Sequence, residues 1–179
     1  LMDILILNAE FTLPIMSKFP KLSNAVLSNN FIKALTKKIF GFVDIPLFSE
    51  KTFAQECKEN NFEILSAQKA EKSDYEVIIV TDPFTVCYEA DGLVKMACVI
   101  RNLGYKVAFL RPYVNGKIKI IRGQRRSFLH YAAKQSARLE RIAKTDKALV
   151  GYDPALTICY RDEYAQMLGE QKGEFNVLL

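Results

Sequence analysis

Two Asp-Pro turns that follow apolar runs constrain the fold of this chain more than any other feature of its sequence. The first stands in VIIVTDPFTVCYE, residues 77–89, and the second in KALVGYDPALTICYRDEY, residues 147–164. In each stretch a short apolar run leads to Asp-Pro and then to Thr, a β-branched residue, Cys and Tyr, which indicates a strand, a turn and a helix. The two Asp-Pro pairs lie 71 residues apart, so a repeated or pseudo-symmetric unit is indicated.

Strand-like and helical stretches alternate from residue 76 onward. Buried strands are expected at Glu76–Thr81, Lys106–Leu110, Ala148–Val150 and Asn176–Leu179. Helices are expected at Glu89–Leu103, Gln124–Thr145 and 157–168. Residues 66–75 read as a polar surface loop, and Lys117–Ile121 is expected to extend or flank the second strand. The alternation predicts an α/β fold, a three-layer structure with a mainly parallel sheet and helices on both faces.

Residues 1–60 are predicted to form a helical arm and connector in front of an α/β unit at 61–179. Asn24–Phe40 has apolar residues at nearly helical spacing, and Gly41 is suited to its C-terminal cap. Residues 44–53 read as an extended connector, and Thr52 is expected to begin a short helix. The basic amphipathic helix can lie on a membrane, or it can pack on the domain or on other parts of a longer chain.

Composition narrows the classes of function and site. Half of the 179 residues are hydrophobic, which suits one domain with an arm, and the net charge of +5 is mild. The single histidine, His130, excludes a histidine-rich metal site, and the four cysteines form no C-x-x-C pair. With no secretory signal pattern, reduced thiols in the cytoplasm are expected, with a peripheral membrane contact of the arm as an alternative. The apolar run 175–179 at the end of the chain suggests a fragment of a longer protein.

The strand-end loops contain the first candidate site residues, Asp82 with Pro83 and Asp153 with Pro154. Functional loops in parallel α/β sheets leave the carboxyl ends of strands, so these loops can hold a ligand. Asp also caps the N–H groups of a following helix, and Pro is tolerated in the first helical turn. The two aspartates are therefore either ligand-binding groups or helix caps, and capping is the simpler interpretation.

Two cysteines, Cys87 and Cys159, follow the Asp-Pro loops at equivalent places. A thiol near a helix N-terminus can have a lowered pKa and become reactive or bind a cofactor. Their apolar neighbours Val86 and Ile158 favour the other interpretation, that both are small core residues.

A basic stripe on the long helix is the remaining candidate. It consists of Arg126, His130, Lys134, Arg138 and Arg141, which step by four or three residues. Such a stripe can grip nucleic acid, but it lacks interleaved surface aromatics, so a solvated or domain-docking face is preferred and no nucleic acid is expected.

The stretches Gly151-Tyr152-Asp153-Pro154-Ala155-Leu156 and Tyr160-Arg161-Asp162-Glu163-Tyr164 resemble the cysteine-rich (CCG) domain of iron–sulfur oxidoreductases. The similarity is to the C-terminal region of large bacterial dehydrogenases that fuse FAD and iron–sulfur domains and oxidise D-2-hydroxy acids, such as D-2-hydroxyglutarate or D-lactate. The resemblance implies a parent enzyme that contains FAD and iron–sulfur clusters, acts on a small 2-hydroxy acid and surrounds this region with other domains.

The chain departs from that family where cluster cysteines are expected after each strand. Asp82-Pro83-Phe84 follows the first strand, residues 112–116 keep only the glycine of the Cys-Cys-Gly tripeptide, and Pro154-Ala155-Leu156 lacks the third cysteine. The resemblance therefore implies a non-catalytic scaffold with degenerate ligands, which holds no metal or cofactor of its own and is inactive alone. A missing second unit would expose a sheet edge and favour a homodimer. The alternative is a stand-alone α/β binding or protein-interaction module that uses the two Asp-Pro-Thr loops.

Overall fold

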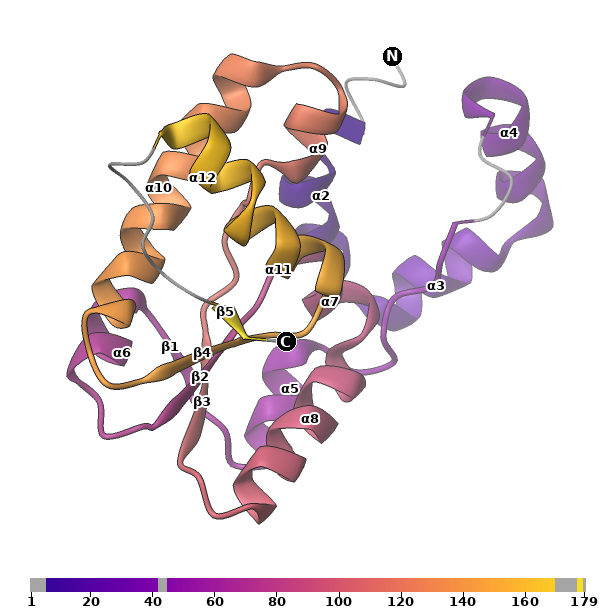
Figure 1. Ribbon diagram of the computed structural model, residues 1–179. Coiled ribbons are helices and arrows are strands. Elements are labelled where there is room, and N and C mark those ends of the chain that lie inside the picture. Colours follow the sequence, from indigo (N-terminus) through magenta and orange to yellow (C-terminus); the bar gives the residue numbers. More distant parts are fainter. Residues whose placement is uncertain (1–5, 42–44, 170–176, 179) are drawn as a thin grey trace.

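The computed structural model describes residues 6–41, 45–169, 177 and 178, and a parallel sheet lies at its centre (Figure 1). The strands lie in the order β1-β3-β2-β4-β5, and all pairings between neighbours are parallel. Their bounds are β1 Ile64–Leu65, β2 Val77–Val80, β3 Val107–Leu110, β4 Ala148–Gly151 and β5 Val177–Leu178. The predicted α/β class with a parallel sheet is confirmed.

The central strands are apolar along their whole length because both faces of the sheet are covered. Every residue of β2 and β3 is buried, the pattern expected for strands between two helical layers. Ile78 and Leu110 pack into the core of one face, whereas Ile79 and Phe109 pack into the core of the other. The sheet thus separates two hydrophobic cores.

Helices form the two outer layers (Figure 1). On one face lie α6 (Ala67–Lys72), α10 (Arg125–Ala143), α11 (Pro154–Arg161) and α12 (Glu163–Leu168), and on the other lie α5 (Phe53–Glu59) and α8 (Ala90–Asn102). Two short helices, α7 (Pro83–Tyr88) and α9 (Lys117–Ile121), follow the ends of β2 and β3. The predicted three-layer arrangement is therefore present.

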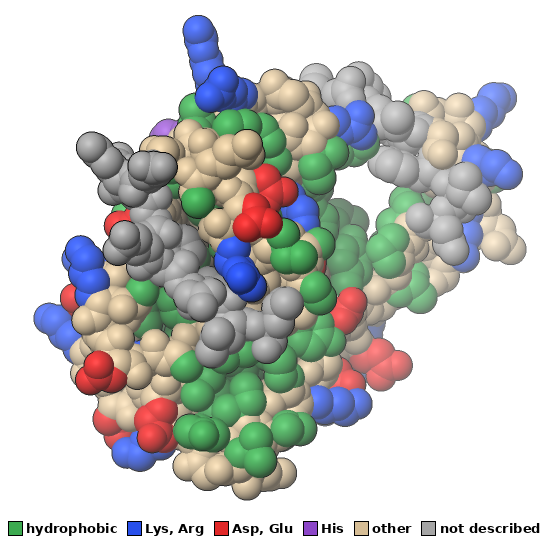
Figure 2. Space-filling view, viewed as in Figure 1, with side chains coloured by type: hydrophobic (Ala, Val, Ile, Leu, Met, Phe, Trp, Pro, Cys, Tyr) green, Lys and Arg blue, Asp and Glu red, His purple; other side chains and the backbone are tan. Residues whose placement is uncertain are grey.

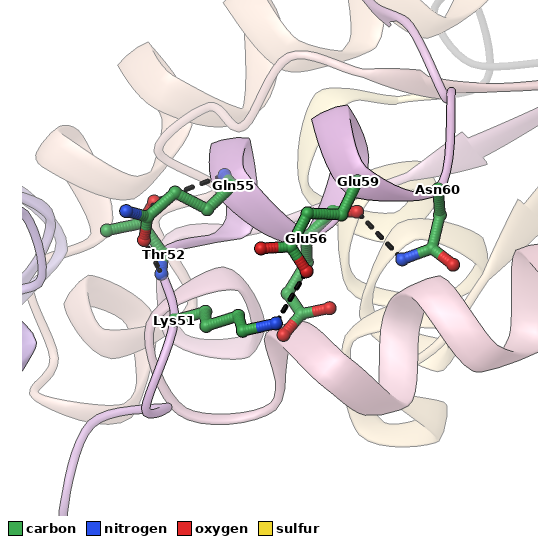
Figure 3. A network of polar contacts seen from close by, with 6 residues as sticks. All are labelled: Lys51, Thr52, Gln55, Glu56, Glu59 and Asn60. Carbon is green, nitrogen blue, oxygen red and sulfur yellow. Dashed lines mark hydrogen bonds and ion pairs between the residues drawn. The ribbon is translucent and has the colours of Figure 1, made fainter.

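Helix α5 begins where the sequence predicted, at Thr52, and a capping box fixes its start (Figure 3). The Thr52 hydroxyl accepts the N–H of Gln55 at 3.2 Å, and the Gln55 side chain accepts the N–H of Thr52 at 2.9 Å. The helix buries Phe53 and Cys57 in the same core as α8. Contacts therefore cross the proposed boundary at residue 60, and that division of the chain stays a prediction.

The N-terminal region is helical, but the single helix predicted for Asn24–Phe40 is wrong. The structure has α2 (Ala9–Met16), α3 (Pro20–Ser28) and α4 (Asn30–Phe40), with a break at Asn29. Asn29 is extended, with ψ at 124°, and its side chain accepts the N–H groups of Phe31 and Ile32, so it caps α4. The predicted cap at Gly41 is confirmed, because its φ of 69° is left-handed.

Three further sequence predictions are corrected by the structure. Residues 66–75 contain helix α6 rather than a loop, because Ser66 caps it and Ala67 and Ala70 anchor it in the core. Lys117–Ile121 forms α9 rather than an extension of a strand. The helix predicted at 157–168 starts earlier, at Pro154, and is broken into α11 and α12 at Asp162.

Two short elements, β1 and α7, were not predicted. The ends of the predicted strand at Asn176–Leu179 lie outside the described residues, whereas Val177 and Leu178 do pair with β4. In the described part of the chain, no helix has the length and apolar character needed to cross a membrane.

Candidate functional site at the strand ends

The two Asp-Pro loops lie side by side at the ends of paired strands. Strand β2 pairs with β4 in a register that places Val80 opposite Gly151, so Asp82 and Asp153 leave the same edge of the sheet. The chain then turns from β2 toward β3 on one side and from β4 toward β5 on the other. Diverging connections of this kind define the switch point at which α/β sheets bind ligands.

Both aspartates cap the helices that follow them. The Asp82 carboxylate accepts the N–H groups of Phe84 at 2.8 Å and Thr85 at 3.2 Å at the start of α7. The Asp153 carboxylate accepts the N–H of Leu156 at 3.1 Å at the start of α11. Each is followed by Pro in the first turn, where no N–H is needed. The shared sequence pattern therefore has a structural cause in both loops.

The two caps differ in their surroundings. Asp82 is 4% exposed, and its second oxygen accepts the hydroxyl of Thr85 in a short contact. Burial raises the pKa of Asp82 above its ordinary value, although its hydrogen bonds to Thr85 and Phe84 oppose that shift. Asp153 is only half-buried. The first loop is therefore part of the protein interior, whereas the second lies nearer the solvent.

A third loop, at the end of β3, joins this edge through Asn115 and Gly116. Asn115 is 3% exposed, and its carbonyl accepts the hydroxyl of Tyr164 at 2.6 Å. Its side chain accepts the N–H of Lys117 at 2.8 Å, and Gly116 has the left-handed φ of 78° that starts α9. Glycine at position 116 is thus required by backbone geometry.

Helix α2 covers the strand ends and brings a buried acid to them. Glu10 is 2% exposed, and its carboxylate accepts the N–H of Asn115 at 3.1 Å. Lys119, also buried, donates to the carbonyl of Leu7 in a short contact. Neither residue was predicted from the sequence. A signal was present, because Glu10 is the only acidic residue between Asp3 and Asp44.

Burial raises the pKa of Glu10 above its ordinary value of 4.5, and the N–H groups of Asn115 and Gly116 oppose that shift. Its second oxygen is buried without a hydrogen-bond partner among the described residues. Burial therefore disfavours the charged form of this acid more in the folded protein than in the unfolded chain. Stability from this group is complete below pH 4.5 and is lost as the pH rises through the raised folded pKa.

We expect Glu10→Gln, which imitates the protonated acid, to flatten this pH dependence. Urea unfolding followed from about pH 4 to pH 8 should show the wild-type protein losing stability relative to Glu10→Gln as the pH rises. The exposed Glu50 provides the matched control, Glu50→Gln, which should run parallel to wild type. Parallel curves for Glu10→Gln and wild type would contradict the expected raised pKa.

A hollow of about 290 Å³ opens between the three loops. Its polar lining comes from Asp82, Asn115, Lys117 and Asp153, and apolar side chains of α7, α9 and α11 complete it. Both carboxylates already accept N–H groups of their own helices. The arrangement therefore fixes the loops rather than supplying a free general base.

The thiols do not share one core, because the sheet separates Cys159 from Cys57 and Cys98. Cys159 is in the core beneath α10 and α11, Cys57 is in the core beneath α8, and Cys98 packs against that second core. Cys87 is 1% exposed, and burial raises its pKa above the ordinary value. Burial also raises the pKa of Cys159 to about 12. Neutral, buried thiols of this kind are poor nucleophiles and poor metal ligands.

Two residues of the basic stripe on α10 make contacts with other parts of the same chain. Arg138 donates to the carbonyl of Arg111 at 2.9 Å and stacks over the ring of Tyr113 at 4.5 Å. Arg141 pairs with Glu71 of α6 at 3.2 Å. These contacts hold α10 to its neighbours. In the described part of the chain, no group of three or more His, Cys, Asp or Glu side chains is arranged to hold a metal ion.

The chain is similar to curated bacterial proteins that share the name D-2-hydroxyglutarate dehydrogenase. Over its whole length the chain is 36% identical to D-2-hydroxyglutarate dehydrogenase of Escherichia coli strain K12 and 38% identical to that of Pantoea ananatis. It is 35% identical, over 98% of its length, to the Haemophilus influenzae protein of that name. The chain spans 18% of the length of each of these relatives. No protein-family model and no solved structure matches it.

Proposed function

We propose that this chain is a non-catalytic scaffold portion of an FAD- and iron–sulfur-dependent oxidoreductase that oxidises D-2-hydroxy acids. The observation that carries the proposal is the end-to-end match to D-2-hydroxyglutarate dehydrogenases more than five times longer. The redox chemistry belongs to the flavin and the clusters, which other parts of the longer enzyme would hold. The proposed partners are those other domains.

The placement of the cysteines supports a scaffold without a cluster of its own. Cluster ligands must be thiolates that converge on one point. Here the sheet separates Cys159 from Cys57, and burial keeps the pKa of both thiols near 12. The residues present therefore do not fit an iron–sulfur cluster, and no step of a reaction is assigned to them.

The strand-end edge supports a role in holding shape. Asp82, Asp153 and Asn115 are committed to hydrogen bonds with the backbone of the helices that follow β2, β4 and β3. Such bonds hold the loops in place, because these side chains already bind the backbone of the helices that follow. In the proposed enzyme this edge would present a fixed surface to neighbouring domains.

A hybrid enzyme tests the proposal. This chain would replace the matching stretch of the E. coli dehydrogenase, and oxidation of D-2-hydroxyglutarate would be followed with an electron-accepting dye. We expect the hybrid to be active, and both the isolated chain and the E. coli enzyme lacking the stretch to be inactive. Cys87→Ala and Cys159→Ala in the hybrid should leave turnover within about twofold, since a positioned ligand typically contributes far more. Activity that survives deletion of the stretch, or a folded but inactive hybrid, would contradict the proposal.

A further inference from the structure

The N-terminal arm exposes an apolar surface that the described residues of the chain do not cover. Besides Phe11, whose ring meets that of Tyr131, seven large apolar side chains of α2, α3 and α4 and the turns between them are each at least 41% exposed. This apolar arm face consists of Ile15, Phe19, Leu22, Val26, Phe31, Leu35 and Ile39. Figure 1 shows α3 and α4 extending away from the sheet, and Figure 2 shows hydrophobic and lysine side chains together on the arm.

Helices as short as these need a surface to pack on. Helix α3 has 9 residues and α4 has 11, whereas isolated helices below about 12–15 residues are marginal in water. None of the described side chains of α3 and α4 is buried. Most helical stability in proteins comes from packing of the apolar face. The arm therefore lacks the contact that would normally stabilise it.

The base of the arm is nevertheless fixed. The Asn24 side chain donates to the carbonyl of Phe48 at 2.9 Å and accepts its N–H at 2.8 Å. Phe48 is itself buried and stacks on Tyr88. The arm thus leaves the α/β body at a defined point, and its exposed face is presented by the fold.

The positive charge of the arm indicates what kind of surface would bind it. Residues 11–43 contain five lysines and no acidic residue. Lys37 and Lys38 lie in the last turn of α4, beside its apolar stripe. A complementary surface would therefore combine an apolar groove with an acidic rim.

The length of the relatives indicates where such a surface lies. The alignment to the E. coli and Pantoea proteins includes the arm and occupies only 18% of their length, so most of each protein lies outside it. We propose that the apolar arm face docks into an apolar, acid-rimmed groove on another domain of the longer dehydrogenase. This inference rests on the proposed function and adds the surface through which the scaffold is held.

Trypsin cleavage at Lys33, Lys37 and Lys38 tests the proposal, because each lies on α4. These sites should be cut at least about tenfold more slowly in the hybrid dehydrogenase than in the isolated chain, since cleavage follows the undocked population. Replacing Phe31, Leu35 and Ile39 together by Ser should restore rapid cleavage. The matched control replaces Val99, Leu103 and Tyr105 by Ser, three side chains that are 49–71% exposed outside the arm, and should keep the protection.

Other occupants predict other results. Equal cleavage in the hybrid and the isolated chain would overturn the proposal. Protection of the isolated chain by phosphatidylglycerol vesicles but not by the rest of the enzyme would assign the face to a membrane. Protection that grows with the concentration of the isolated chain would assign it to a second copy. The activity of the hybrid reports separately on the proposed function, so an active hybrid with an unprotected arm rejects only the docking.

A second measurement needs no hybrid. Hydrogen exchange of the intact E. coli enzyme can be read over the segment that aligns with residues 20–40. Slow exchange there, compared with fast exchange of the same residues in the isolated chain, would support docking. Exchange as fast as in the isolated chain would contradict it.

Discussion

Replacing Phe109 by Ala should lower the free energy of unfolding by about 3–5 kcal/mol, the range seen when a buried aromatic ring is removed from a core. Phe109 is 0% exposed on β3, a strand with a neighbour on each side. Its ring meets Phe53 of α5 at 5.0 Å and Phe62 at 5.6 Å, both edge to face. The substitution therefore removes the ring that joins the sheet to α5 and leaves a cavity.

Urea unfolding monitored by circular dichroism measures this loss. Leu103→Ala is the control, because Leu103 is 71% exposed at the end of α8 and its truncation should cost little. Phe109→Leu should fall between the two, since it keeps part of the buried volume. A loss below about 1 kcal/mol for Phe109→Ala would mean that the core beneath α8 is not packed as described.

The parts of the fold that could be predicted are those that depend on local sequence. Continuous apolar runs identify β2 and β3 because these strands are buried on both faces. The Asp-Pro pairs predict helix starts because cap and first turn are adjacent in sequence. The α/β class and the neighbouring loops follow from these two signals.

The missed features depend on packing or on weak local signals. Helix α6 was read as a loop because only two of its residues, Ala67 and Ala70, are buried in a polar hexapeptide. Strand β1 is two residues long, too short for any periodicity. Asn29 is a polar residue inside an amphipathic pattern, and only its backbone angle reveals that it ends one helix and caps the next.

In the candidate site, too, the residues with nearby partners were predicted and the residue with a distant partner was not. Asp82 and Asp153 were found because their partners lie two or three residues away. Glu10 was not found because its partner, Asn115, is 105 residues away in sequence. The available signal was that Glu10 is the only acidic residue between Asp3 and Asp44. Only the tertiary contact with Asn115 explains why an acid stands there.

Asp82→Ala should cost about 2–3 kcal/mol of folding stability, clearly more than Asp153→Ala, although both remove a helix cap. Loss of a cap typically costs about 1 kcal/mol, which is the expectation for the half-buried Asp153. At Asp82 the N–H groups of Phe84 and Thr85 and the Thr85 hydroxyl would all lose their acceptor. Buried donors without partners add about 1–3 kcal/mol, because water cannot replace the carboxylate there.

Asp82→Asn separates the hydrogen bonds from the charge. The amide oxygen keeps an acceptor for the two N–H groups, and the negative charge is removed, whose desolvation by burial raises the pKa of Asp82. Unfolding of the three variants in urea at neutral pH should therefore rank Asp82→Ala as less stable than both Asp153→Ala and Asp82→Asn. Equal losses for the two alanine variants would show that the two loops are equivalent in energy as well as in sequence. A loss for Asp82→Asn as large as that for Asp82→Ala would show that the charge itself, rather than the capping bonds, stabilises the edge of the sheet.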